Sequence, residues 1–198
     1  MDAADWDARY RETTQMWSRG PNVFVAERLA DAAPGRAIDL AGGEGRNAVW
    51  LAERGWDVEL VEFSRVALDR AVDRADEAGV RLTTTHADVT SEPALERADL
   101  VLIAYLQLPS AQMARVCAYA ASLVGHGGRL LLVGHARRNL LEGFGGPSDP
   151  DVLHDPASLA SWFSTAGLTV DEASEVTRRV DGDHGPQTAI DVLVDAHR

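Results

Sequence analysis

Apolar positions change from a period of two to a helical period several times after residue 37, so strand-like and helix-like stretches alternate. The expected strands cover 37–41, 57–62, 81–86, 99–104 and 128–135, and the expected helices cover 46–54, 65–78 and 110–124. The runs 98–104 and 129–133 are apolar throughout, which is typical of strands covered on both faces. The alternation predicts an α/β domain with a doubly wound, Rossmann-like sheet that is mostly parallel.

The helical spacing also predicts which side chains face the core. It gives each of two helices an apolar stripe, formed by Leu68, Ala71, Val72 and Ala75 and by Met113, Val116, Cys117 and Ala120. We therefore expect Cys117 to be buried.

The two flanks of this region have different patterns. Helices are expected over 5–17 and 23–32, while 139–156 is rich in Gly, Pro and Asp and is interpreted as a long loop or lid. A helix over 156–166 follows, with Asp155 as its N-cap and Gly167 just past its end. Two last strands, 169–180 and 188–196 around a turn at 181–186, predict an antiparallel C-terminal hairpin.

A glycine-rich turn follows the first strand, in the sequence Ile38-Asp-Leu-Ala-Gly-Gly-Glu-Gly-Arg-Asn47. Glycine lets the backbone approach a ligand and adopt a positive φ, so a ligand is expected over this turn. Asp39 lies inside the apolar strand, where a lone carboxylate is costly to bury. We expect it to bind N–H groups of the turn or a cationic group of the ligand.

Two further acidic residues follow strands at the same expected edge of the sheet. Glu62 ends the second strand, where a carboxylate can accept both hydroxyls of an adenosine ribose. Asp88 follows the third strand in the sequence His86-Ala-Asp-Val89. Open α/β sheets bind their ligands at the carboxyl ends of strands, so both acids are candidate ligand residues.

Composition excludes several classes of chemistry. All 19 basic residues are Arg, so a Walker loop and a Schiff-base lysine are excluded. Cys117 is the single cysteine, which excludes an internal disulfide and a cysteine zinc site, and the histidines have no metal-ligand spacing. No metal is expected.

Charge and hydropathy bear on partners and location. The 31 acidic side chains against 19 basic ones give a net charge of −12 with no arginine-rich run, which disfavours nucleic acid. There is no signal-peptide pattern and no apolar run approaching 18 residues, so we expect a cytoplasmic protein without a membrane partner.

Taken together, these motifs resemble the class I S-adenosylmethionine-dependent methyltransferases. The resemblance covers about 37–135, with the glycine turn as motif I, Glu62 as the ribose acid and Ala87-Asp-Val89 as the adenine-side motif. Finer patterns around Trp6, Gly45 and Gly127 are similar to small bacterial methyltransferases of the tellurite-resistance and thiopurine-methyltransferase-like kind. Two residues depart from the family pattern. Ala41 stands where the family usually has the first glycine of the motif, and Gln107 stands where the similar proteins often have His.

The resemblance implies S-adenosylmethionine as cofactor, S-adenosylhomocysteine as product and a helical N-terminal segment folded over the cofactor. The candidate cofactor-binding residues are Trp17, Asp39, Ala41, Gly42, Gly43, Gly45, Arg46, Asn47, Glu62, Phe63, Ser64, Asp88, Val89 and Ala104. No catalytic residue is assigned, and the candidates to orient or deprotonate an acceptor are Tyr105, Gln107 and His135.

We expect one domain over 1–198, made of an N-terminal helical segment or lid (1–33), a cofactor-binding core (37–135), a loop (139–156) and a C-terminal helix and hairpin (157–198). The expected function is methyl transfer to a small molecule with an S, O, N or oxyanion nucleophile, by a monomer or homodimer. Two alternatives stay open. One is an NAD(P)-binding oxidoreductase, since Gly43-Glu-Gly-Arg-Asn-Ala48 also fits the dinucleotide fingerprint, and the other is a cofactor-binding protein without catalysis.

Overall fold

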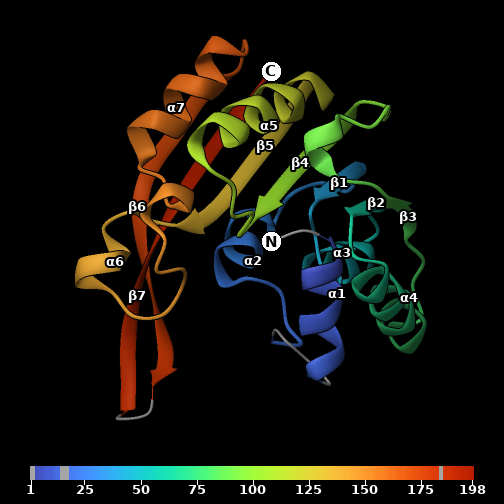
Figure 1. The fold of residues 1–198 in the computed structure, drawn as a ribbon. Coiled ribbons are helices and arrows are strands. Elements are labelled where there is room, and N and C mark those ends of the chain that lie inside the picture. The colour runs from blue at the N-terminus through green and yellow to red at the C-terminus, as the bar shows by residue number, and fades with distance from the viewer. Residues whose placement is uncertain (1–2, 14–17, 183–184) are drawn as a thin grey trace.

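A seven-stranded sheet in the order β3-β2-β1-β4-β5-β7-β6 runs through the centre of the computed structural model, which describes residues 3–13, 18–182 and 185–198 (Figure 1). The parallel strands are β1 (Arg36–Leu40), β2 (Asp57–Glu62), β3 (Thr83–His86), β4 (Ala98–Ala104) and β5 (Val124–His135). The antiparallel strands are β7 (Gly185–His197), which pairs with β5, and β6 (Thr169–Gly182), which forms the edge. The expected fold class is therefore confirmed.

Helices cover both faces of this sheet. One face packs against α2 (Val23–Leu29), α3 (Arg46–Ala52) and α4 (Arg65–Ala78), and the other against α5 (Ser110–Leu123) and α7 (Pro156–Thr165). The helix α1 (Ala3–Glu12) packs on α4 rather than on the sheet (Figure 1). Because the middle of β4 and β5 is covered on both sides, the runs 100–103 and 130–133 are apolar in both directions.

Helix caps and stripes largely follow the sequence pattern. Asp155 caps α7 by accepting a hydrogen bond from the Ser158 amide, and Gly167 follows that helix with φ +87°, as predicted. Cys117 is fully buried, as expected. The prediction that Val72 faces the core is wrong, because 40% of this side chain is exposed at the margin of the α4 stripe.

Several element ends differ from the predictions. The helix expected over 46–54 ends at Ala52, because the Arg54 and Gly55 amides bond to carbonyls three residues back. The strand β5 begins four residues early, since Val124 pairs with Ala98 across a register shift. The helix expected over 23–32 ends at Leu29, and the strand expected from residue 81 starts at Thr83. The first helix covers Ala3–Glu12, and the hairpin strands pair as far as Gly182 and Gly185, inside the turn expected at 181–186. Residues 14–17 and 183–184 lie outside the described part.

The segment 139–156 is not a simple loop, which corrects the expectation. It contains a helical turn, α6 (Asn139–Glu142), and a 3₁₀ turn, η2 (Pro150–Val152). The buried Asn139 organises it, because its Oδ1 accepts a hydrogen bond from the Ile190 amide (2.7 Å) and its Nδ2 donates one to the Gly145 carbonyl (2.8 Å). The glycine and proline content of this segment, on which the loop prediction is based, does not reveal that one buried side chain organises it.

Among the described helices, none is long and apolar enough to cross a bilayer. The described residues also contain no group of three or more His, Cys, Asp or Glu side chains placed to hold a metal ion.

Candidate functional site

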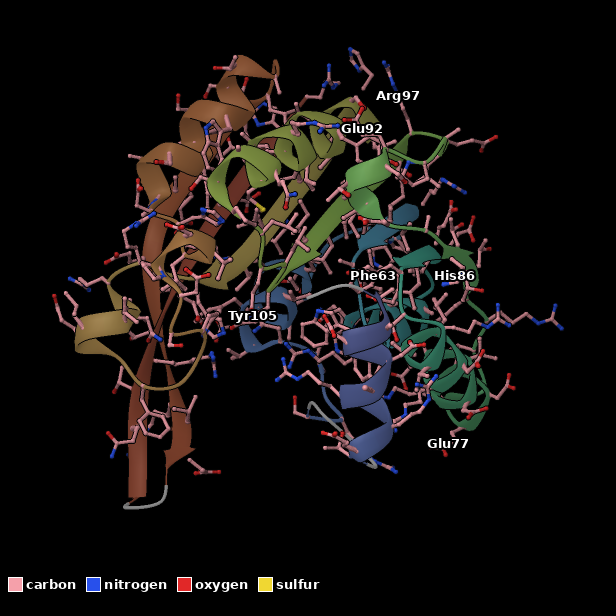
Figure 2. All side chains as sticks on the ribbon, viewed as in Figure 1. Phe63, Glu77, His86, Glu92, Arg97 and Tyr105 are labelled. Atoms are coloured by element: carbon pink, nitrogen blue, oxygen red, sulfur yellow. The ribbon has the colours of Figure 1, made fainter. Side chains whose placement is uncertain are left out.

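The carboxyl ends of the parallel strands bring the candidate residues to one edge of the sheet. Figure 2 shows Phe63, which follows β2, and Tyr105, which follows β4, near the middle of the view, with Glu92 and Arg97 above them. The strand order reverses between β1 and β4, so the turn after β1 lies at the switch point where such sheets bind ligands.

The turn after β1 needs glycine for its own packing. A Cβ on Gly42 would lie 2.3 Å from Leu60 and 2.7 Å from the Asp39 carboxyl, and one on Gly45 would lie 2.8 Å from the Ala71 Cβ. Gly45 has φ +73° and Ala41 has φ +56°, a left-handed conformation that costs a non-glycine residue about 1 kcal/mol. Ala41 is therefore a strained substitute for the motif glycine.

Asp39 is a fully buried carboxylate beneath this turn. Neither of its oxygens has a hydrogen-bond partner of normal geometry among the described residues, so the expected bonds to the turn are not formed. Burial raises the pKa of Asp39 to about 7, against the attraction of the Arg46 guanidinium and a contribution from the Ala48 amide. An orphaned buried carboxylate is costly, and a cationic ligand group would relieve that cost.

Glu62 lies at the end of β2, beside the same turn. Its two oxygens accept hydrogen bonds from the Gly43 amide (3.0 Å) and the Ser64 amide (2.9 Å). Burial raises the pKa of Glu62, while these amides lower it. The carboxylate thus ties β2 to the glycine turn, and a ribose at this place would meet an acid that is already oriented.

The helix α1 is fastened over the start of α4, next to Glu62. The Asp7 carboxylate accepts hydrogen bonds from the Ser64 hydroxyl (2.5 Å) and the Val66 amide (3.3 Å). Arg70 of α4 pairs with Glu44 of the glycine turn (2.7 Å) and also donates to the Tyr10 carbonyl. This attachment supports the expectation that the N-terminal segment covers the turn.

The other cofactor candidates take varied positions. Asp88 is exposed and caps the short 3₁₀ turn η1 (Val89–Ser91), and the Val89 side chain packs in the core. Phe63 and Ala104 are partly buried at the carboxyl edge. Asn47 is buried, and its Oδ1 accepts a hydrogen bond from the Asn22 amide (2.9 Å). Trp17 lies outside the described residues.

Tyr105 is the centre of a polar network at the carboxyl edge of the sheet, next to the end of β5. Its hydroxyl lies 2.6 Å from Asp191 Oδ2 and accepts hydrogen bonds from Asn22 Nδ2 (3.1 Å) and Arg178 Nε (3.0 Å). Arg178 Nε also lies 2.6 Å from the same Asp191 oxygen. Burial and the Asp191 carboxylate raise the pKa of Tyr105 well above its ordinary range, so the phenol stays protonated and donates to Asp191.

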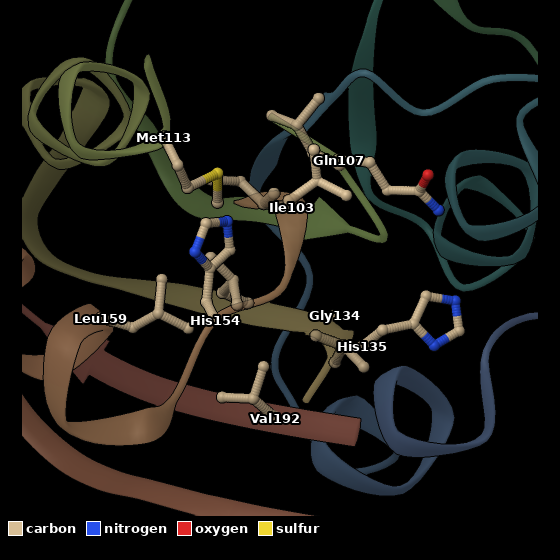
Figure 3. A pocket seen from close by; sticks show the side chains of 12 residues that line it. Ile103, Gln107, Met113, Gly134, His135, His154, Leu159 and Val192 are labelled. Atoms are coloured by element: carbon tan, nitrogen blue, oxygen red, sulfur yellow. The ribbon is translucent and has the colours of Figure 1, made fainter. Parts of the chain in front are cut away.

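His135 ends β5 next to this network. Its Nδ1 lies 3.2 Å from Asp191 Oδ1, and its ring lies 4.7 Å from the Tyr105 ring. Figure 3 shows the His135 ring turned away from a small cavity between β4, β5 and α7, which Gln107 also lines. That cavity, of about 10 Å³, has room for one water molecule and excludes an acceptor.

Sequence reasoning missed Asn22, Arg178 and Asp191, although a signal for one of them was present. Asp191 lies within the apolar run Ala189-Ile-Asp-Val-Leu-Val194 and is fully buried, as Asp39 is in its own strand. The argument that selected Asp39 applies equally to Asp191. Arg178 and Asn22 carry no such mark, because only the tertiary fold brings them to Tyr105.

Comparisons with known proteins agree with this geometry. Residues 37–128 match the methyltransferase domain family. The tRNA 5-carboxymethoxyuridine methyltransferase of Escherichia coli (strain K12) is 32% identical over 72% of this chain, and the chain spans 63% of that relative's length.

Solved structures share the fold over nearly the whole chain. A protein from work on the conversion of a disulfide bond into a thioacetal group during echinomycin biosynthesis superposes with a TM-score of 0.79 at 20% identity, covering 99% of this chain and 92% of that one. The N-methyltransferase NodS from Bradyrhizobium japonicum WM9, in complex with S-adenosyl-L-homocysteine, gives 0.73 at 15% identity, covering 99% and 98%.

The family match selects the methyltransferase reading of the glycine turn over the dinucleotide reading. Together with a fold that methyltransferases such as NodS share, it identifies residues 37–128 as a methyltransferase domain.

Proposed function

We propose that this protein transfers the methyl group of S-adenosylmethionine to a nucleophilic atom of a small-molecule acceptor and releases S-adenosylhomocysteine. The observation that carries the proposal is the orphaned Asp39 carboxylate beneath the glycine turn, with the oriented carboxylate of Glu62 beside it. These two acids suit the ammonium of a methionine moiety and the hydroxyls of a ribose.

When bound, the cofactor supplies an electrophilic methyl group on a sulfonium. The chain's own task is then to bind, align and exclude water, because an aligned nucleophile about 3 Å from the methyl carbon needs no covalent help from the protein. The helix α1, held by Asp7 and Arg70, covers one side of the turn. The Tyr105 hydroxyl is held by three side chains. We therefore assign it to positioning the acceptor and not to accepting a proton.

His135 is the residue we assign to proton removal where the acceptor is an alcohol or phenol. With Nδ1 toward Asp191 Oδ1 (3.2 Å), the tautomer that places hydrogen on Nδ1 leaves the Nε2 lone pair for an acceptor. An ionised thiol or another oxyanion would need no base. Gln107, which has no hydrogen-bond partner among the described residues, is a candidate to orient the acceptor.

A tRNA acceptor is the second candidate, because the E. coli relative is named for one. The net charge of −12 argues against it, since a polyanion is repelled and nucleic-acid binding depends on basic side chains. We therefore propose a small molecule, and not a nucleic acid, as the methyl acceptor.

Calorimetry with S-adenosylhomocysteine, run beside NAD and NADP, tests the cofactor. We expect saturable binding of one equivalent of S-adenosylhomocysteine and no binding of either dinucleotide. Release of S-adenosylhomocysteine is then measured with thiol, phenol, amine and carboxylate acceptors and with total tRNA. Turnover on tRNA alone would replace the small-molecule proposal, and binding without turnover on any acceptor would favour a cofactor-binding protein without catalysis.

A further inference from the structure

Arg178 of β6 uses only part of its guanidinium within the protein. Its Nε contacts Asp191 and the Tyr105 hydroxyl, while no described residue accepts a hydrogen bond from its two terminal nitrogens. The side chain is 26% exposed, so these nitrogens are within reach of a ligand. The end of a guanidinium offers two parallel N–H donors that match the two oxygens of a carboxylate.

The neighbouring ion pairs do not neutralise this end of Arg178. Two other carboxylates of β6 have arginines of their own, because Glu172 pairs with Arg28 and Glu175 pairs with Arg138 (3.0 Å), and Asp171 lies 2.7 Å from His197. Asp191 is already shared between Arg178 Nε and Tyr105. The terminal N–H donors of Arg178 therefore remain open to a ligand, although the chain as a whole is strongly acidic.

This guanidinium lies beside the candidate site and not on a remote surface. Arg178 Cζ is 5.5 Å from the centre of the Tyr105 ring, and Arg46 Cζ, from the start of α3, is 5.7 Å from the same ring. Tyr105 directly follows the last residue of β4, Ala104, at the carboxyl edge. A group bound by Arg178 would thus lie on the acceptor side of the glycine turn.

We propose that the terminal nitrogens of Arg178 bind a carboxylate of the methyl acceptor, with Asp191 and Tyr105 holding the guanidinium in place. The inference rests on the proposed function and narrows its acceptor to a small carboxylic acid. A carboxylate suits one planar fork, whereas a dianionic phosphate calls for several cations, which an acidic chain disfavours. The carboxylate serves as an anchor or as the nucleophile itself.

Ligand binding tests the subsite without methyl transfer. Benzoate, phenyl phosphate and the neutral benzamide are titrated by calorimetry into the protein, both free and saturated with S-adenosylhomocysteine. We expect benzoate to bind more tightly than phenyl phosphate, and benzamide not to bind. R178Q should weaken benzoate by about 10- to 100-fold, the loss of a charged hydrogen-bonded pair, and R179Q should leave it unchanged. Arg179 is the matched control because it is the exposed neighbour on the same strand.

Three results would overturn the proposal: no benzoate binding to the wild-type protein, equal binding of benzoate and benzamide, or unchanged benzoate affinity in R178Q. Since R178Q leaves Asp191 without its cation, its fold is checked by circular dichroism. R178K supplies a second variant, which keeps a cation near Asp191 but lacks the fork. We expect R178K to bind benzoate less tightly than the wild-type protein.

Affinity for S-adenosylhomocysteine separates this inference from the function on which it rests. We expect R178Q to bind S-adenosylhomocysteine as the wild-type protein does, because Arg178 lies on the acceptor side. Failure of the wild-type protein to bind it would remove the proposed function, while the benzoate series would still report on the subsite. Once activity is established, kcat/KM for 2-mercaptobenzoate should fall about 10- to 100-fold more in R178Q than kcat/KM for thiophenol does.

Discussion

Replacing Asp39 by Asn should stabilise the unliganded protein at alkaline pH while weakening its cofactor. The folded pKa of Asp39, about 7, lies above its ordinary value of 3.8, so the folded state binds more protons than the unfolded chain between these values. The free energy of unfolding therefore falls as pH rises through this window. The difference corresponds to about 4 kcal/mol, of which about 3 kcal/mol is lost between pH 5 and pH 8.

Urea unfolding at pH 5 and pH 8 measures the effect. The Asn variant has no titrating group at this position, so its free energy of unfolding, relative to that of the wild-type protein, should rise by about 3 kcal/mol between the two pH values. Asp73→Asn, an exposed replacement on α4, is the matched control and should leave the pH dependence unchanged.

The same variant should lose affinity for S-adenosylhomocysteine by about 10- to 100-fold, because an amide cannot replace a carboxylate beside an ammonium group. Stability and binding would then change in opposite directions, which is typical of a residue retained for function. A wild-type-minus-variant difference that is the same at both pH values would refute the electrostatic reasoning. Unchanged ligand affinity would remove Asp39 from the cofactor site.

The remaining predictions concern the ribose acid, the strained alanine and the buried thiol. Glu62→Ala should weaken S-adenosylhomocysteine by about 1–3 kcal/mol in calorimetry, and an equal loss in the exposed Glu96→Ala would show that the effect is not local. Ala41→Gly should raise the free energy of unfolding by up to about 1 kcal/mol, because glycine adopts the positive φ without strain. The control Ala118→Gly in α5 should lower the free energy of unfolding by about 1 kcal/mol. A lower free energy of unfolding in Ala41→Gly would contradict the strain. Burial raises the pKa of Cys117 to about 12, so iodoacetamide at pH 8 should not label the native protein within the time that labels it fully in urea. Rapid native labelling would show that α5 opens.

The sheet was largely predictable because its information is local. Apolar runs fix the buried strands, and the caps at Asp155 and Gly167 mark helix ends by rules that act within a few residues. Element ends such as Ala52 and Val124 were not predictable, since a tightened turn and a register shift depend on neighbouring segments.

The two halves of the candidate site differ in the same way. The glycine turn and Glu62 could be proposed from sequence, because strand ends in one stretch of chain meet at one edge. The acceptor side could not, since contacts across more than 70 residues join Tyr105 to Arg178 and Asp191. Only the structure shows that the Asp39 oxygens have no hydrogen-bond partner of normal geometry among the described residues.

The antiparallel hairpin has a consequence for how such an enzyme changes its specificity. Arg178 and Asp191 lie on adjoining strands outside residues 37–128, the span that the family match covers. Their alignment depends on strand register, in which Asp191 faces Val176 and Ala189 faces Arg178. A slip of one residue in either strand would turn the side chains of that strand to the other face of the sheet. With the proposed carboxylate subsite on this hairpin, exchanging the whole hairpin, rather than single residues, is the step expected to give a new acceptor preference on an unaltered cofactor fold.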